Sequence, residues 1–195
     1  MSKEKSPYLP IVLVSGLPRS GTSMMMRMLQ AGGMTLLTDD TRPADASNPW
    51  GYFEYAPVKA SKQAVDWVAS APGKAVKVVS PLLQYLPLSY SYKVIFMERA
   101  MASVMQSQHQ MLEREGKIVN PKAEYVLEQY YTRHLEQVHQ WLKERPNILV
   151  LPLSFKETLQ CPLVTARVVS DFLDTPLNVE AMVAIVSPAL SQEKI

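Results

Sequence analysis

Apolar residues along the chain follow two patterns, short continuous runs and helical repeats. The continuous runs predict buried strands at residues 11–14, 75–79, 92–97 and 148–151. Stretches with helical periodicity predict helices near 22–31, 57–71, 101–115, 121–144, 163–173 and 179–186. Because strands of this kind alternate with helices, we expect an α/β fold with three layers, αβα, around a mostly parallel central sheet.

The first predicted strand runs into a loop of small residues, Gly16-Leu17-Pro18-Arg19-Ser20-Gly21-Thr22-Ser23, before a helix begins. This segment has the outline of the phosphate-binding pattern G-x-x-x-x-G-K-[ST], but Thr22 stands at the lysine position and the cation is Arg19. A triphosphate with Mg²⁺ needs that lysine, whereas a shorter anionic group needs only loop amides and one nearby cation. The loop therefore predicts a nucleotide without a γ-phosphate.

A second phosphate site is predicted after the strand at 92–97. Arg99 follows this strand, and Ser103 and Ser107 lie one turn apart on one face of the next helix. The three side chains can converge on one phosphate. The alternative is that Arg99 pairs with Glu98 or with a carboxylate of a helix, and that the two serines only pack.

These two motifs, in this order, resemble those of the sulfotransferase family. The segment 18–23 is similar to the family's P-[KR]-S-G-T-[ST] loop, and the eight-residue interval from Arg99 to Ser107 is similar to the family's 3′-phosphate pair. The resemblance extends from about residue 11 to residue 188. It implies a P-loop NTPase-like sulfotransferase fold that uses 3′-phosphoadenosine 5′-phosphosulfate (PAPS) as co-substrate and no metal.

The resemblance also implies roles for particular residues. Those expected to bind the donor are Pro18, Arg19, Ser20, Gly21, Thr22, Ser23, Arg99 and Ser107. The N–H groups of residues 20–23 would hold the 5′-phosphate, and Arg19 would neutralise charge on the leaving phosphate. Lys77, in a Lys-Val-Val-Ser-Pro segment similar to the family's K-T-H-L-P, would reach the sulfuryl oxygens. Its alternative role is that of a lysine on an edge strand, with its ammonium group in water.

The catalytic base is not provided by the family position, because Val79 replaces the histidine. We expect Glu54 to take the acceptor proton, with Trp50 and Phe53 raising the pKa of its carboxyl group by burial. The alternative is that Glu54 caps the next helix or pairs with Lys59. Two further departures concern adenine: Met24 stands where cytosolic members have a tryptophan, and no glycine follows Gly116 to form their C-terminal donor-binding segment.

Composition limits the remaining possibilities. The 195 residues predict a single sulfotransferase-like domain over 1–195, with a flexible N-terminus at 1–10 and a tail at 189–195. A net charge of +2 without a basic block predicts no nucleic-acid partner. The absence of a signal sequence or membrane span predicts a cytoplasmic protein. Cys161 is expected to be a spectator thiol, and His134 and His139 are expected to be surface residues.

The sequence therefore predicts a sulfotransferase that acts on a hydroxyl or amine of a small-molecule or carbohydrate acceptor. Two alternatives stay open at this stage: a P-loop kinase that uses ATP and Mg²⁺, and a non-catalytic phosphonucleotide-binding protein. The missing loop lysine disfavours the kinase, and Val79 in place of the histidine keeps the non-catalytic protein open. Neither the identity of the acceptor nor the oligomeric state can be read from the residues.

Overall fold

The computed structural model describes residues 9–39, 42–45, 48, 51–60 and 66–186. Their strands and helices follow in the order β1 (Ile11–Gly16), α1 (Thr22–Ala31), α2 (Ala56–Ala60), η1 (Asp66–Ser70), β2 (Ala75–Lys77), η2 (Ser80–Tyr85), β3 (Tyr92–Glu98), α3 (Met101–Arg114), α4 (Pro121–Lys143), β4 (Ile148–Ser154), α5 (Phe155–Gln160), α6 (Pro162–Leu173) and α7 (Val179–Ile185), where η marks a 3₁₀ helix. The expected N-terminal segment and C-terminal tail lie almost wholly outside the described residues.

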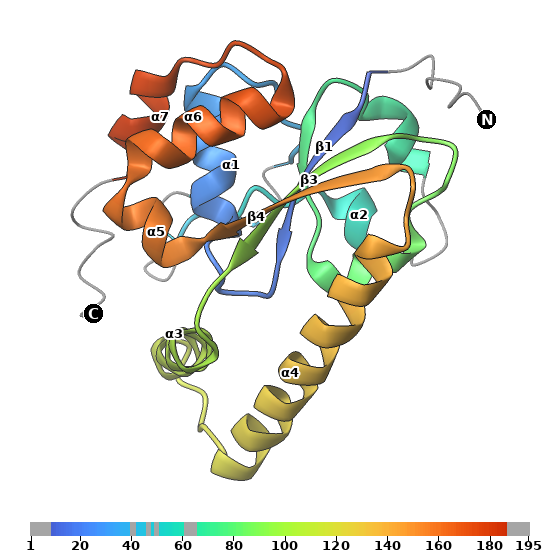
Figure 1. Cartoon of the computed structure of the whole chain (residues 1–195). Helices are drawn as coiled ribbons and strands as arrows, with labels where there is room; N and C mark the ends of the chain where they lie inside the picture. Colours follow the sequence, from blue (N-terminus) through green and yellow to red (C-terminus); the bar gives the residue numbers. More distant parts are fainter. Residues whose placement is uncertain (1–8, 40–41, 46–47, 49–50, 61–65, 187–195) are drawn as a thin grey trace.

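The four strands form one parallel sheet in the order β2-β1-β3-β4, which confirms the expected α/β class (Figure 1). After β1 the chain goes to β2 on one side and then returns to β3 on the other. The carboxyl end of β1 is therefore a topological switch point, the place where open parallel sheets bind ligands. The loop at 16–23 begins there.

Two hydrophobic clusters cover the two faces of the sheet. One contains the helix α1 together with residues of α6 and α7, which lie on the same side in Figure 1. Its methionines, Met24, Met25, Met26 and Met28, are buried, as expected of core-filling side chains. The other cluster joins η1, η2 and the C-terminal half of α4 to the opposite face. The parallel strand β1 is buried over its whole length, which explains its continuous apolar run.

The structure differs from the sequence-based expectation at three helical segments. The helix expected at 57–71 is described as α2 and the 3₁₀ helix η1, and residues 61–65 between them lie outside the described residues. The short segments η2 and α5 were not expected. In α5, the hydroxyl of Ser154 accepts a hydrogen bond from the N–H of Glu157 at 3.2 Å, so the helix starts directly where β4 ends. Among the described residues, no helix is long and apolar enough to cross a membrane.

Candidate functional site

The loop between β1 and α1 is held in shape by two glycines. Gly16 has φ +143° and Gly21 has φ +98°, and a Cβ atom on Gly16 would lie 2.5 Å from the carbonyl oxygen of Met97. Gly21 precedes the first residue of α1, and no side chain of the described residues caps this end of the helix. The helix therefore directs its first N–H groups and its positive dipole end toward the carboxyl edge of the sheet, an arrangement suited to an anion.

One detail of the loop differs from the expectation. The N–H and the hydroxyl of Ser20 both donate to the carbonyl oxygen of Leu17, at 3.2 and 2.7 Å. Ser20 is thus used inside the loop. The first N–H group of α1 with a backbone acceptor is that of Met25, which donates to the carbonyl oxygen of Gly21 at 3.1 Å. Of the expected cradle at residues 20–23, the N–H groups of Gly21, Thr22 and Ser23 therefore face an incoming anion, whereas that of Ser20 does not.

Arg19, Arg99 and Ser107 come together although they are far apart in the sequence. The Nε atom of Arg19 donates to Oγ of Ser107 at 3.0 Å, and an NH1 group of Arg99 donates to the carbonyl oxygen of Arg19 at 2.7 Å. Arg19 itself has φ +70°, which is uncommon for a residue with a side chain. The two predicted phosphate sites are thus neighbours, joined by one arginine.

Phe155 is a component of this region that the sequence reasoning missed. Its ring lies against the loop, so that a Cβ atom on Gly21 would be 2.3 Å from Cδ2 of the ring. The guanidinium carbon of Arg99 lies over the same ring, 4.8 Å from its centre. Phe155 directly follows β4, which pairs with β3. This position at the carboxyl end of a strand was the one signal in the sequence that could have identified it as a site residue.

Lys77 lies at the end of β2, paired in register with Val14 of β1. Its Nζ atom donates to Oγ of Ser23 at 3.1 Å and to the carbonyl oxygen of Tyr52 at 2.5 Å. The side chain therefore points toward the loop and does not extend into water, in contrast to the edge-strand alternative. The pKa of the Lys77 ammonium group is lowered from 10.5 to about 8. Burial is the main cause; Glu54 opposes the shift, and Lys59, Arg42 and Arg19 add to it.

Ser23 is fixed by two donors. Besides Lys77, the Nδ2 group of Asn48 donates to its Oγ atom at 3.0 Å. The hydroxyl oxygen of Ser23 thus accepts two hydrogen bonds, and its own hydrogen points away from both donors. Asn48 was not recognised in the sequence because it lies in the aperiodic segment 38–50, parts of which lie outside the described residues.

Glu54 faces the same small cavity as Lys77 and Val79, about 20 Å³ in volume. Its carboxylate pairs with Nζ of Lys59 at 2.5 Å, which is the alternative left open by the sequence, and Arg42 lies 3.8 Å away. Trp50, expected beside Glu54, lies outside the described residues. The Glu54 carboxylate thus shares a cavity with Lys77 and also pairs with Lys59 and Arg42.

His134 is not a simple surface residue. Its Nε2 atom lies 2.8 Å from Oγ of the buried Ser80, which begins η2 directly after Val79. Burial lowers the pKa of the imidazole of His134, and His139 lowers it further. Sequence reasoning missed this contact because the two residues are 54 positions apart.

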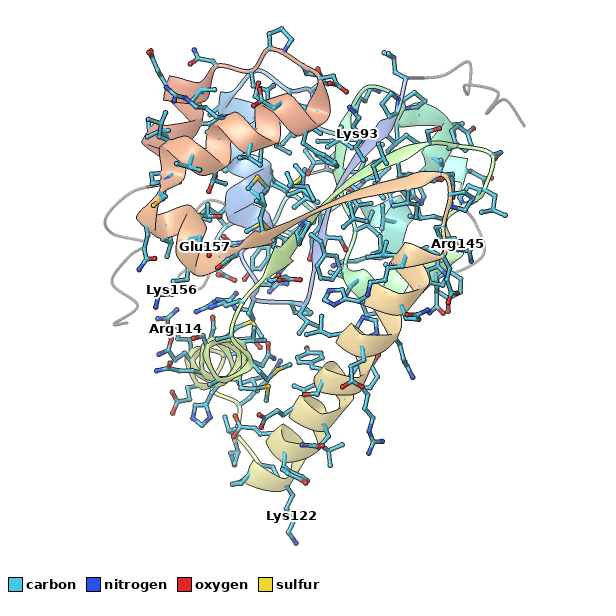
Figure 2. All side chains as sticks on the ribbon, in the orientation of Figure 1. Lys93, Arg114, Lys122, Arg145, Lys156 and Glu157 are labelled. Atoms are coloured by element: carbon cyan, nitrogen blue, oxygen red, sulfur yellow. The ribbon has the colours of Figure 1, made fainter. Side chains whose placement is uncertain are left out.

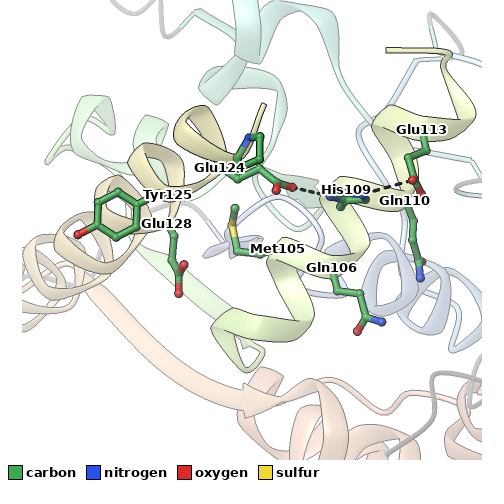
Figure 3. Close-up of a pocket in the computed structure, with 9 residues that line it drawn as sticks. Met105, Gln106, His109, Gln110, Glu113, Glu124, Tyr125 and Glu128 are labelled. Atoms are coloured by element: carbon green, nitrogen blue, oxygen red, sulfur yellow. Dashed lines mark hydrogen bonds and ion pairs between the residues drawn. The ribbon is translucent and has the colours of Figure 1, made fainter. Parts of the chain in front are cut away.

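A cavity of about 580 Å³ lies away from these residues, between α3 and α4 (Figure 3). In it, His109 lies 2.8 Å from Glu124 and 3.3 Å from Glu113. The hydrogen bond with Glu124 is the main cause that raises the pKa of the exposed imidazole. None of the predicted site residues lines this cavity. Over the described ranges, no group of three histidine, cysteine, aspartate or glutamate side chains is arranged to hold a metal ion.

Comparison with known proteins identifies the family of the chain. The family model described as the sulfotransferase domain matches residues 9–194. No curated protein sequence matches the chain.

Several solved structures share the fold. The sulfotransferase domain of the Synechococcus PCC 7002 olefin synthase has a TM-score of 0.55 at 14% identity, over 100% of this chain and 86% of that one. A sulfotransferase from Alicyclobacillus acidocaldarius has a TM-score of 0.51 at 15% identity, over 85% and 81%. Mouse sulfotransferase SULT7A1, in complex with PAP, has a TM-score of 0.51 at 15% identity, over 96% and 66%.

Proposed function

The chain belongs to the sulfotransferase domain family, and from this premise we propose that it transfers a sulfuryl group from PAPS to a hydroxyl or amine of a small-molecule or carbohydrate acceptor. The observation that carries the proposal is the convergence of the loop, Arg19, Arg99, Ser107 and Lys77 at the carboxyl end of β1. The mouse relative with the same fold was solved with PAP, the desulfonated form of the donor, which supports PAPS as the co-substrate. The family match over 9–194 supports a single domain.

In the proposed complex, the donor lies across the loop. The N–H groups of Gly21, Thr22 and Ser23 bind the 5′-phosphate at the positive end of α1. Arg99 and Ser107 bind the 3′-phosphate. Arg19, whose side chain reaches Ser107 from the loop, lies between the two phosphate sites and neutralises the charge that develops on the bridging oxygen.

The transfer step needs a group on the sulfuryl oxygens and an acceptor for the proton. Lys77, which reaches Ser23, is placed to contact the sulfuryl oxygens. The acceptor oxygen or nitrogen attacks sulfur, the bond from sulfur to the bridging oxygen breaks, and its electron pair stays on the 5′-phosphate of PAP. Glu54, in the same cavity as Lys77, takes the acceptor proton. No step in this scheme uses a metal ion.

Binding without metal tests the proposal directly. PAP at about 100 times its dissociation constant should stabilise the protein by about 2.7 kcal/mol in the absence of divalent ions. ATP with Mg²⁺ should stabilise it much less, because Thr22 occupies the lysine position that a triphosphate requires. Equal or greater stabilisation by ATP and Mg²⁺ would favour the kinase instead. Binding of PAPS without transfer to any acceptor would favour the non-catalytic protein.

A further inference from the structure

The cavity that contains Glu54 has cations at its rim. The Glu54 side chain is 15% exposed, whereas those of its two partners, Lys59 and Arg42, are 53% and 39% exposed. Lys59 also lines the cavity together with Lys77 and Val79. The proposed proton acceptor is thus mostly buried, and the two cations that contact it are more exposed.

Arg42 is held in place by stacking. Its guanidinium carbon lies 3.4 Å from the ring centre of Tyr52, and the hydroxyl of Tyr52 donates to Asp45 at 2.6 Å. The backbone carbonyl of the same tyrosine accepts the hydrogen bond from Lys77. Stacking uses the face of a guanidinium and leaves its N–H edge available for an oxyanion. Arg42 is therefore ordered next to the proposed transfer site.

Each carboxylate oxygen of Glu54 already has a cation beside it. Arg42 lies 3.8 Å from Oε1 and Nζ of Lys59 lies 2.5 Å from Oε2, so these cations occupy the positions that an acceptor hydroxyl would need. Arg19 and Lys77, by contrast, face the loop, where the phosphosulfate of a bound donor would neutralise them. Binding of the donor therefore does not break the ion pairs of Glu54 with Lys59 and Arg42. The acceptor is the remaining component of the reaction that can break them.

We propose that the acceptor carries an oxyanion group, a carboxylate, sulfate or phosphate, in addition to the hydroxyl or amine that is sulfated. This inference rests on the proposed function of the site. The oxyanion binds Lys59 and Arg42 at the rim, and Glu54 is thereby released. The reacting hydroxyl enters the cavity between Glu54 and Lys77, whose volume of about 20 Å³ has room for one group of the size of a water molecule.

The proton and electron balance of the step is simple. The acceptor O–H bond breaks as the new S–O bond forms, and the proton moves to a carboxylate oxygen of Glu54. The bond between sulfur and the bridging oxygen breaks, with its electron pair on the 5′-phosphate. No bond of the acceptor's oxyanion group forms or breaks in this step. It exchanges one ion pair, Lys59 with Glu54, for another, Lys59 with the acceptor.

Binding of matched probes to the PAP complex tests the proposal. 4-Hydroxybenzoate and 4-hydroxybenzenesulfonate carry a phenol and an oxyanion, whereas 4-hydroxybenzyl alcohol has the same ring and phenol without the charge. Titration calorimetry at low ionic strength should show at least about tenfold tighter binding of one or both charged probes than of the alcohol. The better charged probe distinguishes carboxylate from sulfonate recognition.

Variants assign the effect to the rim. In Lys59→Ala and in Arg42→Ala, the preference for the charged probe should fall to about threefold or less. Lys122→Ala removes an exposed lysine at the far end of α4 (Figure 2) and should leave the preference unchanged. Equal affinity for charged and neutral probes, lack of binding by all three at millimolar concentration, or a preference that survives loss of both rim cations would overturn the proposal. Failure to bind PAP would instead overturn the proposed function.

Hydrolysis of the donor by water gives a second measurement that needs no acceptor. If Lys59 restrains Glu54, Lys59→Ala should accelerate the release of PAP from PAPS in buffer by several-fold, because Glu54 can then deprotonate water. Lys59→Arg, which keeps the charge, should not. The double variant Glu54→Gln/Lys59→Ala should lose the acceleration. A structural effect of Lys59 would not depend on the carboxylate, so acceleration that persists in the double variant contradicts the mechanism.

Discussion

The Nε atom of Arg19 donates a hydrogen bond to Oγ of Ser107 at 3.0 Å, across 88 positions of sequence. This bond joins the loop after β1 to the second turn of α3, so the two predicted phosphate sites are parts of one surface. A second hydrogen bond joins the same segments, because NH1 of Arg99 donates to the carbonyl oxygen of Arg19 at 2.7 Å. Substitutions in the loop and in α3 should therefore weaken the binding of the same ligand.

Arg99→Ala should weaken recognition of the 3′-phosphate. The variant loses a charge-assisted interaction of roughly 1.5–3 kcal/mol, so PAP should bind about 10- to 100-fold more weakly. Affinity for adenosine 5′-phosphate, which lacks the 3′-phosphate, should change little. Calorimetric titration with both nucleotides measures the difference, and Arg167→Ala on the exposed face of α6 is the matched control. Equal losses for the two nucleotides would mean that Arg99 acts only by supporting the loop.

Ser107→Ala should have a smaller effect in the same direction. One neutral hydroxyl contributes about 0.5–1.5 kcal/mol, which corresponds to a loss of about 2- to 12-fold in PAP affinity. Ser103→Ala, one turn earlier on α3, is the control, because Ser107 is the buried serine of this helix that contacts Arg19. If the two variants bind PAP alike, the interval between Arg99 and Ser107 does not define a phosphate site.

Gly21→Ala should destabilise the fold through both strain and collision. The residue has φ +98°, and an added Cβ atom would lie 2.3 Å from the ring of Phe155. Gly33→Ala separates the two effects, because Gly33 has φ +95° and nothing within 4 Å of an added Cβ atom. The strain in Gly33→Ala should cost about 1 kcal/mol, and Gly21→Ala should cost clearly more. Urea unfolding measures the loss of stability in each variant. Equal losses would show that the ring of Phe155 moves aside at no cost in stability.

Much of this arrangement could be predicted from the sequence, because it depends on local patterns. The runs that form β1 and β3 and the helical repeat of α4 identify themselves by spacing, and strand order then brings Arg19, Arg99 and Lys77 to one edge. The contacts of Phe155 and of His134 with Ser80 could not be predicted. They depend on tertiary packing between elements distant in sequence, and neither residue belongs to a local motif.

The surroundings of Glu54 illustrate the same limit. The sequence left two roles open for this residue, that of a base and that of a partner for Lys59. The structure shows the ion pair and also places the carboxylate beside Lys77 and Val79. The stacking of Arg42 on Tyr52 had no signal in the sequence, since the segment that contains both has no periodicity.

Lys77 should make stability depend on pH in the alkaline range. Burial lowers the pKa of its ammonium group from 10.5 to about 8 in the folded state. Between these values the unfolded chain binds more protons, so this group makes the protein more stable as pH rises from about 8 to 10.5. The cost of burying the charge at neutral pH is about 3 kcal/mol at most, before the hydrogen bonds to Ser23 and Tyr52 offset it. Other groups also titrate in this range, so the difference between wild type and Lys77→Met is the quantity to measure.

Urea unfolding at pH 7, 8, 9 and 10 measures this difference. The free energy of unfolding of the wild type should increase relative to that of Lys77→Met as pH rises. A difference that is constant over this range would show that the pKa of Lys77 is not lowered. The same titration should weaken binding of intact PAPS above about pH 8 more than binding of PAP, because only PAPS carries the sulfuryl oxygens that Lys77 is proposed to contact.

Glu54→Gln separates chemistry from binding. The substitution keeps the size and polarity of the side chain and removes its basicity, so turnover should fall by about 10²–10⁴. Donor affinity should stay near that of the wild type, since the proposed donor contacts lie on the loop and on α3. Radiolabelled sulfate transfer into fractionated extracts identifies an acceptor for this assay, and the single-turnover rate with that acceptor isolates the chemical step.

A matched comparison distinguishes loss of the base from loss of the ion pair. Lys59→Met breaks the same pair from the other side and leaves the carboxylate in place. If Glu54 is the base, Lys59→Met should retain turnover with a saturating acceptor, whereas Glu54→Gln should not. Comparable losses in both variants would make the pair itself the important feature, with a structural role. Unchanged single-turnover rates in Glu54→Gln would eliminate it as the base. The next carboxylates to substitute would be Asp39 and Asp45, together with Asp40, which lies outside the described residues.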